Sequence, residues 1–266
     1  MTTDYPFSVD AREFAGKRIL VTGGTKGLGA AIARRFLLSG ATVATTARSP
    51  SADIKSILFI QADSATASGA RRIIDRIQEE WGGVDILVNN VGSGLGLSGG
   101  FESVLDESWQ AIFDINFMSA VRLDRAFVPG MVERKSGGVI HIGTLWARLP
   151  QPDANIAYSA AKGALRTYSK GLAKAVAPHG VRVNMVSPGF FETESAHDFI
   201  GRIAARESIS EDAARQQLMA RGGGIPLGRV GRPAEIAETV ALLASDRAGF
   251  ATGQDILLDG GVWPSI

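Results

Sequence analysis

The chain has 266 residues, of which 45% are hydrophobic and 21% charged, and its 28 basic and 27 acidic side chains leave a formal net charge of +1. This size and composition fit one large α/β domain with a full core better than two small ones. The balanced charge, without a basic tract, argues against nucleic acid or a membrane surface as a partner, and the absence of cysteine excludes disulfides, thiolate catalysis and Cys-based metal sites.

Runs of apolar and β-branched residues alternate with segments of helical periodicity along the chain. The runs predict seven strands: Arg18–Thr22, Ala41–Thr46, Ile57–Gln61, Val84–Asn89, Gly138–Ile142, Val181–Val186 and Asp255–Leu258. The segments between them predict helices over Leu28–Ser39, Arg71–Trp81, Asp106–Met131, Ala157–Val176 and Pro233–Leu243. Apolar strands separated by helices indicate an α/β fold with a doubly wound, seven-stranded parallel sheet and helices on both faces.

The domain organisation is expected to be simple. Residues 1–16 read as an N-terminal arm and residues 17–266 as one domain without repeats or linkers. The stretch of about 190–228 breaks the alternation, because it is long, charged and helix-rich, and it ends in a triple glycine that could act as a hinge. It is either a surface excursion or a helical lid over a substrate site.

No targeting or metal-binding segment is evident. The start of the chain has neither the basic region nor the apolar core of a signal peptide, and no run of about 18 apolar residues predicts a membrane span. Together with the absence of cysteine, this favours a cytoplasmic protein. The three histidines lie in no metal-ligand motif, so no metal is expected, and each reads as structural or surface.

A glycine-rich loop connects the first strand to the first helix. In Thr22-Gly-Gly-Thr-Lys-Gly-Leu-Gly29, glycines 23, 27 and 29 have the spacing Gly-x-x-x-Gly-x-Gly. Glycines allow a tight turn and close backbone approach, and a helix N-terminus offers free N–H groups and a positive dipole end to a pyrophosphate. The strand–turn–helix context therefore predicts a dinucleotide site.

The end of the second strand bears on which dinucleotide is bound. A fold that prefers NAD usually has an acidic residue there for the ribose 2′-hydroxyl. Here the stretch is Thr45-Thr46-Ala47-Arg48, without a carboxylate. A 2′-phosphate would meet the guanidinium of Arg48, which can bind phosphate oxygens bidentately, and Lys26 of the glycine loop. NADP(H) is therefore expected, with NAD(H) as the alternative and Arg48 as a solvated turn residue.

Tyr158-Ser-Ala-Ala-Lys162 places a phenol and an ammonium four residues apart, on one face of a helix. Tyrosine ordinarily loses its proton near pH ~10, and a neighbouring cation lowers that pKa toward the range useful for proton transfer. Taken alone, the pair could also be an ordinary surface contact.

Together these motifs resemble those of the short-chain dehydrogenase/reductase family, from about Gly16 to Trp263. The family's order is matched by the glycine loop, by Asn89-Asn90-Val91-Gly92 after the fourth strand, by the Tyr158–Lys162 pair and by Pro188-Gly189 with Thr193. The Val at 91 replaces the family's Ala. The resemblance implies a single-domain Rossmann fold and an oxidoreductase that uses a nicotinamide cofactor.

The resemblance also implies roles for individual residues. Asp63 would contact adenine, Asn116 would help hold a proton-relay water, and Pro188-Gly189 with Thr193 would grip the nicotinamide carboxamide. The catalytic set would be Asn116, Thr144, Tyr158 and Lys162. The cofactor set would be Gly23, Thr25, Lys26, Gly27, Leu28, Gly29, Arg48, Asp63, Ser64, Asn90, Val91, Gly92, Tyr158, Lys162, Pro188, Gly189, Phe191 and Thr193.

The implied reaction interconverts a carbonyl and a secondary alcohol. NADPH would deliver hydride to the carbonyl carbon while Tyr158 supplies the proton to the oxygen, and Lys162 would lower the tyrosine pKa and hold the ribose hydroxyls. A departure lies at the third catalytic position. The family usually has Ser-Ser where this chain has Gly143-Thr144, 14 residues before Tyr158. Threonine keeps the hydroxyl and adds a methyl group, so Thr144 either replaces the serine or is merely a strand-end residue.

Substrate and assembly are less constrained. Candidate pocket residues at 93–97, 145–146, 190–191 and in the stretch after Thr193 are largely aromatic and apolar, which suggests a hydrophobic ketone or acyl-type carbonyl rather than a polyol. Family members are commonly homotetramers, so a homotetramer is expected. Two alternatives stay open: an NAD-preferring alcohol dehydrogenase of the same family, and a non-catalytic dinucleotide sensor.

Overall fold

The computed structural model describes residues 5–50, 56–94, 101–151, 156–220 and 224–265. Its centre is a seven-stranded, wholly parallel sheet with the order β3-β2-β1-β4-β5-β6-β7. The predicted fold class is thus confirmed, with strand ends shifted by a few residues. The strands are β1 Arg18–Thr22, β2 Thr42–Ala47, β3 Leu58–Gln61, β4 Ile86–Asn89, β5 Gly137–Ile142, β6 Val181–Pro188 and β7 Asp255–Leu258.

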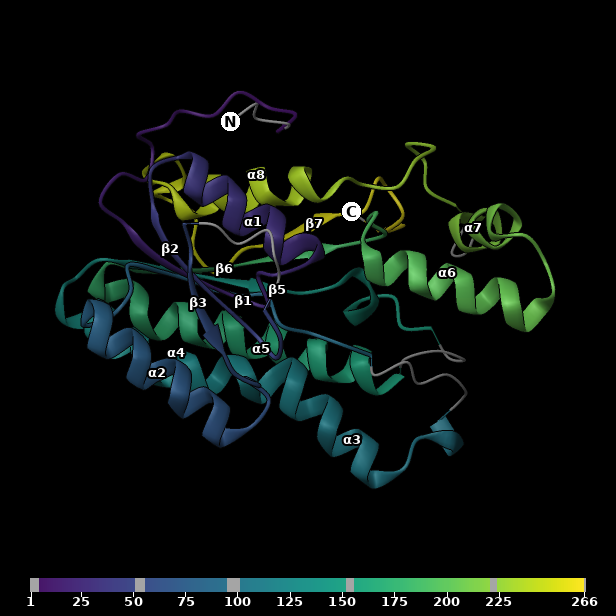
Figure 1. Cartoon of the computed structure of the whole chain (residues 1–266), viewed down its shortest axis with the longest axis horizontal. Helices are drawn as coiled ribbons and strands as arrows, with labels where there is room; N and C mark the ends of the chain where they lie inside the picture. Colours follow the sequence, from purple (N-terminus) through teal and green to yellow (C-terminus); the bar gives the residue numbers. More distant parts are fainter. Residues whose placement is uncertain (1–4, 51–55, 95–100, 152–155, 221–223, 266) are drawn as a thin grey trace.

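Helices cover both faces of the sheet (Figure 1). Side chains of a strand alternate between faces, so Ile19 and Val21 of β1 enter one core and Leu20 the other. The first core contains apolar residues of α1 (Gly27–Leu38) and α8 (Pro233–Ala244). The second contains residues of α2 (Ala67–Trp81), α4 (Ser119–Glu133) and α5 (Ile156–Val176).

The helix expected over Asp106–Met131 is interrupted. It comprises α3 (Asp106–Phe113), a π-helical turn over Asp114–Met118, and α4. A single π turn holds one more residue than an α turn, and such turns occur frequently at functional sites. Asn116 lies in this turn and is buried.

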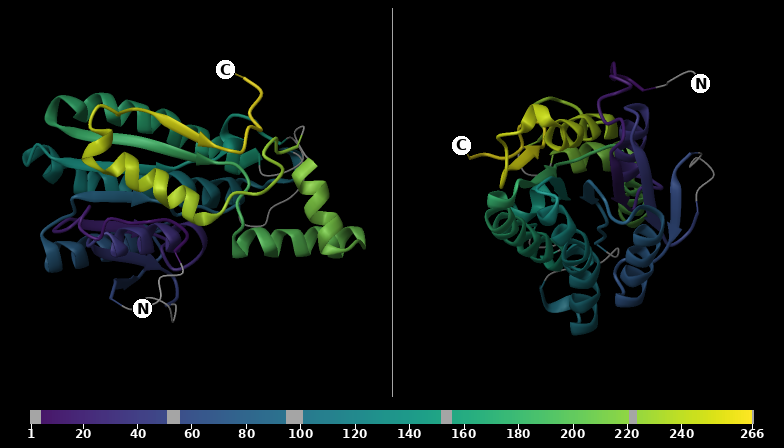
Figure 2. Two further views of the ribbon diagram at one scale, coloured as in Figure 1. Left: turned by 90° about the horizontal axis from the view of Figure 1, so that it is seen from above. Right: turned by 90° about the vertical axis from the view of Figure 1, so that its left-hand side faces the viewer.

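The stretch after β6 forms a helical subdomain of its own. Helices α6 (Glu194–Glu207) and α7 (Glu211–Ala220) project beyond the carboxyl ends of the strands (Figure 2). They pack on each other through a separate small apolar cluster that includes Ile200, Ile203 and Leu218. The expected triple-glycine hinge lies largely outside the described residues. Short 3-10 turns complete the fold: η1 Phe101–Ser103, η3 Leu145–Ala147, η4 Ala177–His179 and η6 Asp246–Ala248.

The described part of the N-terminal arm lies against α1 and α8. Phe14 packs edge-on against Phe36, with ring centroids 4.9 Å apart. The buried guanidinium of Arg35 pairs with Glu13 at 2.6 Å and with Glu238 at 2.7 Å. None of the helices in the described part of the chain is both long and apolar enough to span a membrane.

Candidate active site

A cavity of about 630 Å³ opens at the carboxyl ends of the strands. In an open α/β sheet this is where ligands bind, next to the point where the strand order reverses, here between β1 and β4. Of the residues proposed from the sequence for cofactor binding or catalysis, all line this cavity except Thr25 and Asn116. The chain thus brings residues from positions 23 to 193 to one surface.

The glycine loop has the geometry that requires glycine. Gly23 and Gly27 have φ of +65° and +53°, in the left-handed region. A Cβ on Gly29 would lie 2.2 Å from the carbonyl oxygen of Gly23, so the helix start and the loop touch. Asn90 holds the loop from β4, because its Nδ2 donates to the carbonyls of Thr22 at 2.8 Å and Gly23 at 3.2 Å. A bound pyrophosphate would face a preformed cradle of backbone N–H groups.

Two cations line the cavity, Arg48 directly after β2 and Lys26 in the glycine loop. Arg48 is exposed, and its carbonyl oxygen accepts a hydrogen bond from Gln61. Lys26 is exposed as well, with its Nζ 3.6 Å from a carboxylate oxygen of Glu194 in the first turn of α6. Helix α6 thus supplies a carboxylate that competes for one of the two cations proposed to bind a 2′-phosphate.

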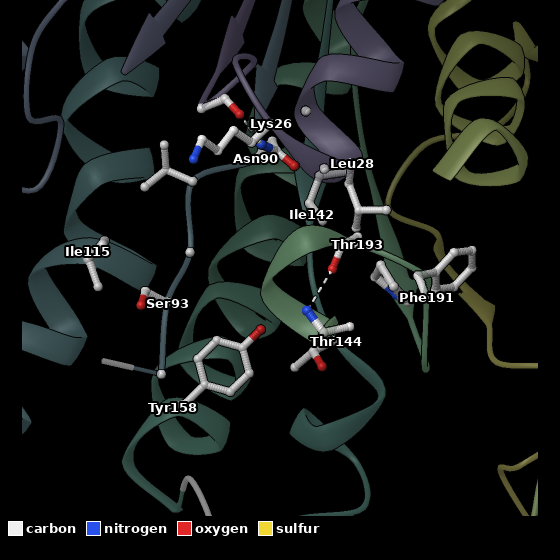
Figure 3. Close-up of a pocket in the computed structure, with 18 of the residues that line it drawn as sticks. Lys26, Leu28, Asn90, Ser93, Ile115, Ile142, Thr144, Tyr158, Phe191 and Thr193 are labelled. Carbon is white, nitrogen blue, oxygen red and sulfur yellow. Dashed lines mark hydrogen bonds between the residues drawn. The ribbon is translucent and has the colours of Figure 1, made fainter. Parts of the chain in front are cut away.

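Tyr158 occupies the first turn of α5, and Figure 3 shows its ring directed into the cavity. Burial raises the pKa of the Tyr158 phenol, and a hydrogen bond with Thr144 acts in the opposite direction. The net direction is therefore opposite to the lowering expected from Lys162. In this environment the phenol keeps its proton, which is the form that can protonate a carbonyl oxygen.

Thr144 follows β5 and caps the short turn η3. Its Oγ1 accepts a hydrogen bond from the backbone N–H of Trp146 at 3.3 Å. The Thr144 hydroxyl also forms a hydrogen bond with the Tyr158 phenol, so it connects the end of β5 to the phenol. Trp146 lines the cavity, whereas Leu145, also considered for the pocket, is 1% exposed and does not line it. Positions 95–97 of the proposed pocket lie outside the described residues.

Lys162 is almost fully buried, with 2% of its surface exposed. Its Nζ donates to the carbonyl oxygen of Ile142 at 2.8 Å, and burial lowers its pKa to about 8. The ammonium fits there because position 92 is glycine. A Cβ on Gly92 would lie 3.0 Å from Nζ.

Asn116 does not line the cavity but fixes its wall. Its Nδ2 donates to the carbonyl oxygens of Ser93 at 2.8 Å and Ile112 at 2.9 Å. Its Oδ1 accepts from the backbone N–H of Ser93 at 3.0 Å. The side chain therefore holds the backbone that follows β4, and the proton-relay role proposed for Asn116 stays a prediction.

The stretch after Thr193, a predicted part of the pocket, contributes Phe199 of α6 and Leu218 of α7 to the cavity lining, although the sequence does not single out these two residues. Apolar residues in such a stretch are equally typical of a helix pair that packs on itself. Gln151, which follows η3, also lines the cavity and is not predicted from the sequence. Gly143 also lines the cavity, where a Cβ would meet Ser187 Oγ at 2.4 Å.

Known proteins resemble the chain over nearly its whole length. A family model described as enoyl-(acyl carrier protein) reductase matches residues 23–263. The 3-oxoacyl-[acyl-carrier-protein] reductase FabG of Escherichia coli (strain K12) is 35% identical over 261 residues, covering 94% of this chain and 98% of that protein.

Solved structures agree. L-sorbose reductase from Gluconobacter frateurii, complexed with NADPH and L-sorbose, matches with a TM-score of 0.88 and 29% identity over 96% of this chain and 100% of that one. Ligand-free aldohexose dehydrogenase from Thermoplasma acidophilum matches with a TM-score of 0.83 and 28% identity over 96% and 98%. Fold, cavity and relatives define an oxidoreductase. More particularly, the chain belongs to the short-chain dehydrogenase/reductase family.

Proposed function

We propose that the protein is an NADP(H)-dependent oxidoreductase that interconverts a carbonyl and a secondary alcohol. The observation that carries the proposal is the convergence of Tyr158, Lys162 and Thr144 on the cavity that also contains the glycine loop. The loop fits a dinucleotide, because Gly23, Gly27 and Gly29 line the cavity and the start of α1 lies directly against the loop, where a Cβ on Gly29 would be 2.2 Å from the Gly23 carbonyl oxygen. When bound, the nicotinamide supplies or accepts the hydride.

The chain's own residues handle the proton and the oxygen. Thr144 orients the substrate oxygen toward the Tyr158 hydroxyl, and Tyr158 gives its proton to that oxygen as the carbon gains hydride. Lys162 holds the ribose hydroxyls and stabilises the tyrosinate that remains. In the reverse direction, the tyrosinate takes the proton of the alcohol.

Cofactor preference rests on Arg48 and Lys26, and on the absence of a carboxylate at the end of β2. We expect a lower KM for NADPH than for NADH, and we expect Arg48→Asp to reverse or abolish that preference. A lower KM for NADH than for NADPH in the wild type would favour the NAD-preferring alternative, and an unchanged ratio of the two KM values in the variant would show that Arg48 does not set the preference. The complex of Gluconobacter frateurii L-sorbose reductase with NADPH supports the proposed cofactor.

The substrate is proposed to be a hydrophobic ketone or an acyl-type carbonyl. Trp146, Phe190, Phe199 and Leu218 give the cavity an apolar wall beside Tyr158. Similarity to FabG agrees with an acyl substrate, whereas the sorbose and aldohexose enzymes share the fold at comparable identity. The proposed substrate class therefore rests on the apolar residues that line the cavity and not on sequence identity to these relatives.

One screen tests the reaction and the substrate class together. NADPH oxidation is followed with a 3-oxoacyl thioester, a hydrophobic ketone and a ketose, with Tyr158→Phe as the matched blank. Turnover of the first two, lost in the blank, is the expected result. Turnover of the ketose alone would overturn the substrate class, and no turnover with NADPH still binding would favour a dinucleotide sensor. The proposed homotetramer is checked by light scattering, where a monomeric mass would contradict it.

A further inference from the structure

A second cavity, of about 450 Å³, lies between α5, β6 and β7. It shares no lining residue with the large cavity. Its charged lining residues are Arg148 after η3, Arg166 and Lys170 of α5, and Asp255 at the start of β7. Three cations thus meet one carboxylate in the described lining.

That carboxylate already accepts three hydrogen bonds. Its Oδ2 accepts from Arg148 Nη2 at 2.6 Å and from Arg166 Nε at 2.9 Å. Its Oδ1 accepts from the hydroxyl of Ser187 at 2.6 Å. Asp255 therefore fixes the two guanidinium groups in place, and it cannot neutralise both of them and the ammonium of Lys170.

The cations retain unused hydrogen-bonding capacity. The Nε of Arg148 is buried and has no hydrogen-bond partner among the described residues. Such a buried donor costs free energy unless an acceptor reaches it. Lys170 makes one described hydrogen bond, from Nζ to the carbonyl oxygen of Gly253 at 2.9 Å, although an ammonium has three protons to donate. Arg148, Arg166 and Lys170 thus give the cavity a positive charge, and the ammonium of Lys170 has donors to spare for an acceptor-rich anion.

Thr167, Ser169 and Gln254 are the uncharged polar side chains of the described lining, and the hydroxyl of Ser169 is already engaged. Ser169 Oγ lies 2.9 Å from Nδ1 of the buried His141, whose Nε2 lies 3.0 Å from a carboxylate oxygen of Asp124. Because a carboxylate only accepts, Nε2 carries the ring proton and the Ser169 hydroxyl donates to Nδ1. This resembles a Ser–His–Asp relay, but the His141 ring is wholly buried and the serine proton is committed to it.

We propose that this second cavity binds a small oxyanion, a phosphate or carboxylate group, through Arg148, Arg166 and Lys170. Guanidinium groups match both anions bidentately, and the lysine adds a point charge. Arg148 also connects the site to the catalytic region, since Trp146 and Gln151 of the same segment line the large cavity. An anion on Arg148 restrains this segment at a distance from the reacting atoms.

The test is direct titration by calorimetry at constant ionic strength, with inorganic phosphate in one arm and succinate in the other. Saturable binding of either anion is expected, and the tighter one identifies the group recognised. In the double variant Arg166→Gln/Lys170→Gln, binding weakens by about tenfold or more, because two charge-assisted contacts are lost. Both residues are exposed enough for the variant to fold, and its thermal midpoint in anion-free buffer confirms this.

Two controls locate the site. Lys174→Gln removes an exposed lysine from the same helix outside the cavity, and Arg48→Gln removes a cation from the large cavity. Both variants are expected to bind within about twofold of the wild type, since neither residue contacts the site. The proposal is overturned if the wild type shows no saturable binding, if the double variant keeps wild-type affinity, or if Arg48→Gln is the variant that loses it. None of these outcomes depends on catalytic turnover.

Discussion

Replacing Lys162 with methionine should make the cofactor-free protein more stable at neutral pH, although it removes a residue proposed to be catalytic. Burial lowers the pKa of Lys162 from 10.5 to about 8. At about 1.36 kcal/mol per unit of pKa shift, that difference makes the buried ammonium cost about 3 kcal/mol of folding free energy. Methionine removes the cost, and it also removes the hydrogen bond to the Ile142 carbonyl oxygen, worth about 1 kcal/mol. The expected net gain at pH 7 is about 2 kcal/mol.

The pH dependence carries the sharper test. A lysine whose pKa is lower in the folded protein costs stability fully below about pH 8, and progressively less as pH rises toward 10.5, where the unfolded chain also loses the proton. The difference in the free energy of unfolding between Lys162→Met and the wild type should therefore shrink by about 2 kcal/mol from pH 7 to pH 9.5.

Urea unfolding without cofactor, at one fixed protein concentration, measures this gap. Lys174→Met, an exposed lysine of the same helix, should show no such trend. If Lys162→Met is less stable than the wild type at pH 7, or if its gap is the same at both pH values, the buried ammonium is not the cause.

Three further predictions concern the site and its support. Thr144→Val keeps the side-chain shape but removes the hydroxyl, and kcat should fall about 10²-fold with unchanged NADPH affinity; unchanged turnover would remove Thr144 from the mechanism. Gly29→Ala forces a Cβ to 2.2 Å from the Gly23 carbonyl oxygen and so displaces the loop. The affinity for NADPH, measured by fluorescence titration, should fall about tenfold or more, and an unaltered Kd would contradict a cofactor role for the loop. Arg182 donates to five carbonyl oxygens in and after the last turn of α8. Arg182→Met should therefore lower the free energy of unfolding, measured in urea, by about 3 kcal/mol. A loss of less than about 1 kcal/mol would show that water replaces the guanidinium as donor.

The fold was predictable because its signals are local. Successive side chains of a strand point to opposite faces of the sheet, so the apolar run Ile19-Leu20-Val21 indicates that both faces are covered. The placement of Tyr158 and Lys162 on one cavity was predictable for a similar reason, since helical spacing fixes their common face. The glycine loop adds a conformational requirement that no other residue meets as easily.

What the sequence did not reveal depends on contacts between remote positions. Arg148 and Asp255 are 107 residues apart, and nothing local indicates that they meet at 2.6 Å. The sequence indicates only a structural or surface role for His141, and its position between Asp124 and Ser169 follows only from the packing of β5 against α4 and α5. The upward shift in the pKa of Tyr158 likewise depends on burial, which a helical spacing does not report.

The π turn before α4 sets the rotational phase of that helix. Each residue of an α-helix advances the side-chain direction by about 100°, so one extra residue turns everything downstream by that amount. Asn116 can therefore hold Ser93 while Leu123 and Phe127 still face the sheet. Deleting a single residue from 114–118 would rotate α4 by about 100° relative to Asn116, so either the Asn116–Ser93 hydrogen bonds or the packing of Leu123 and Phe127 would be lost.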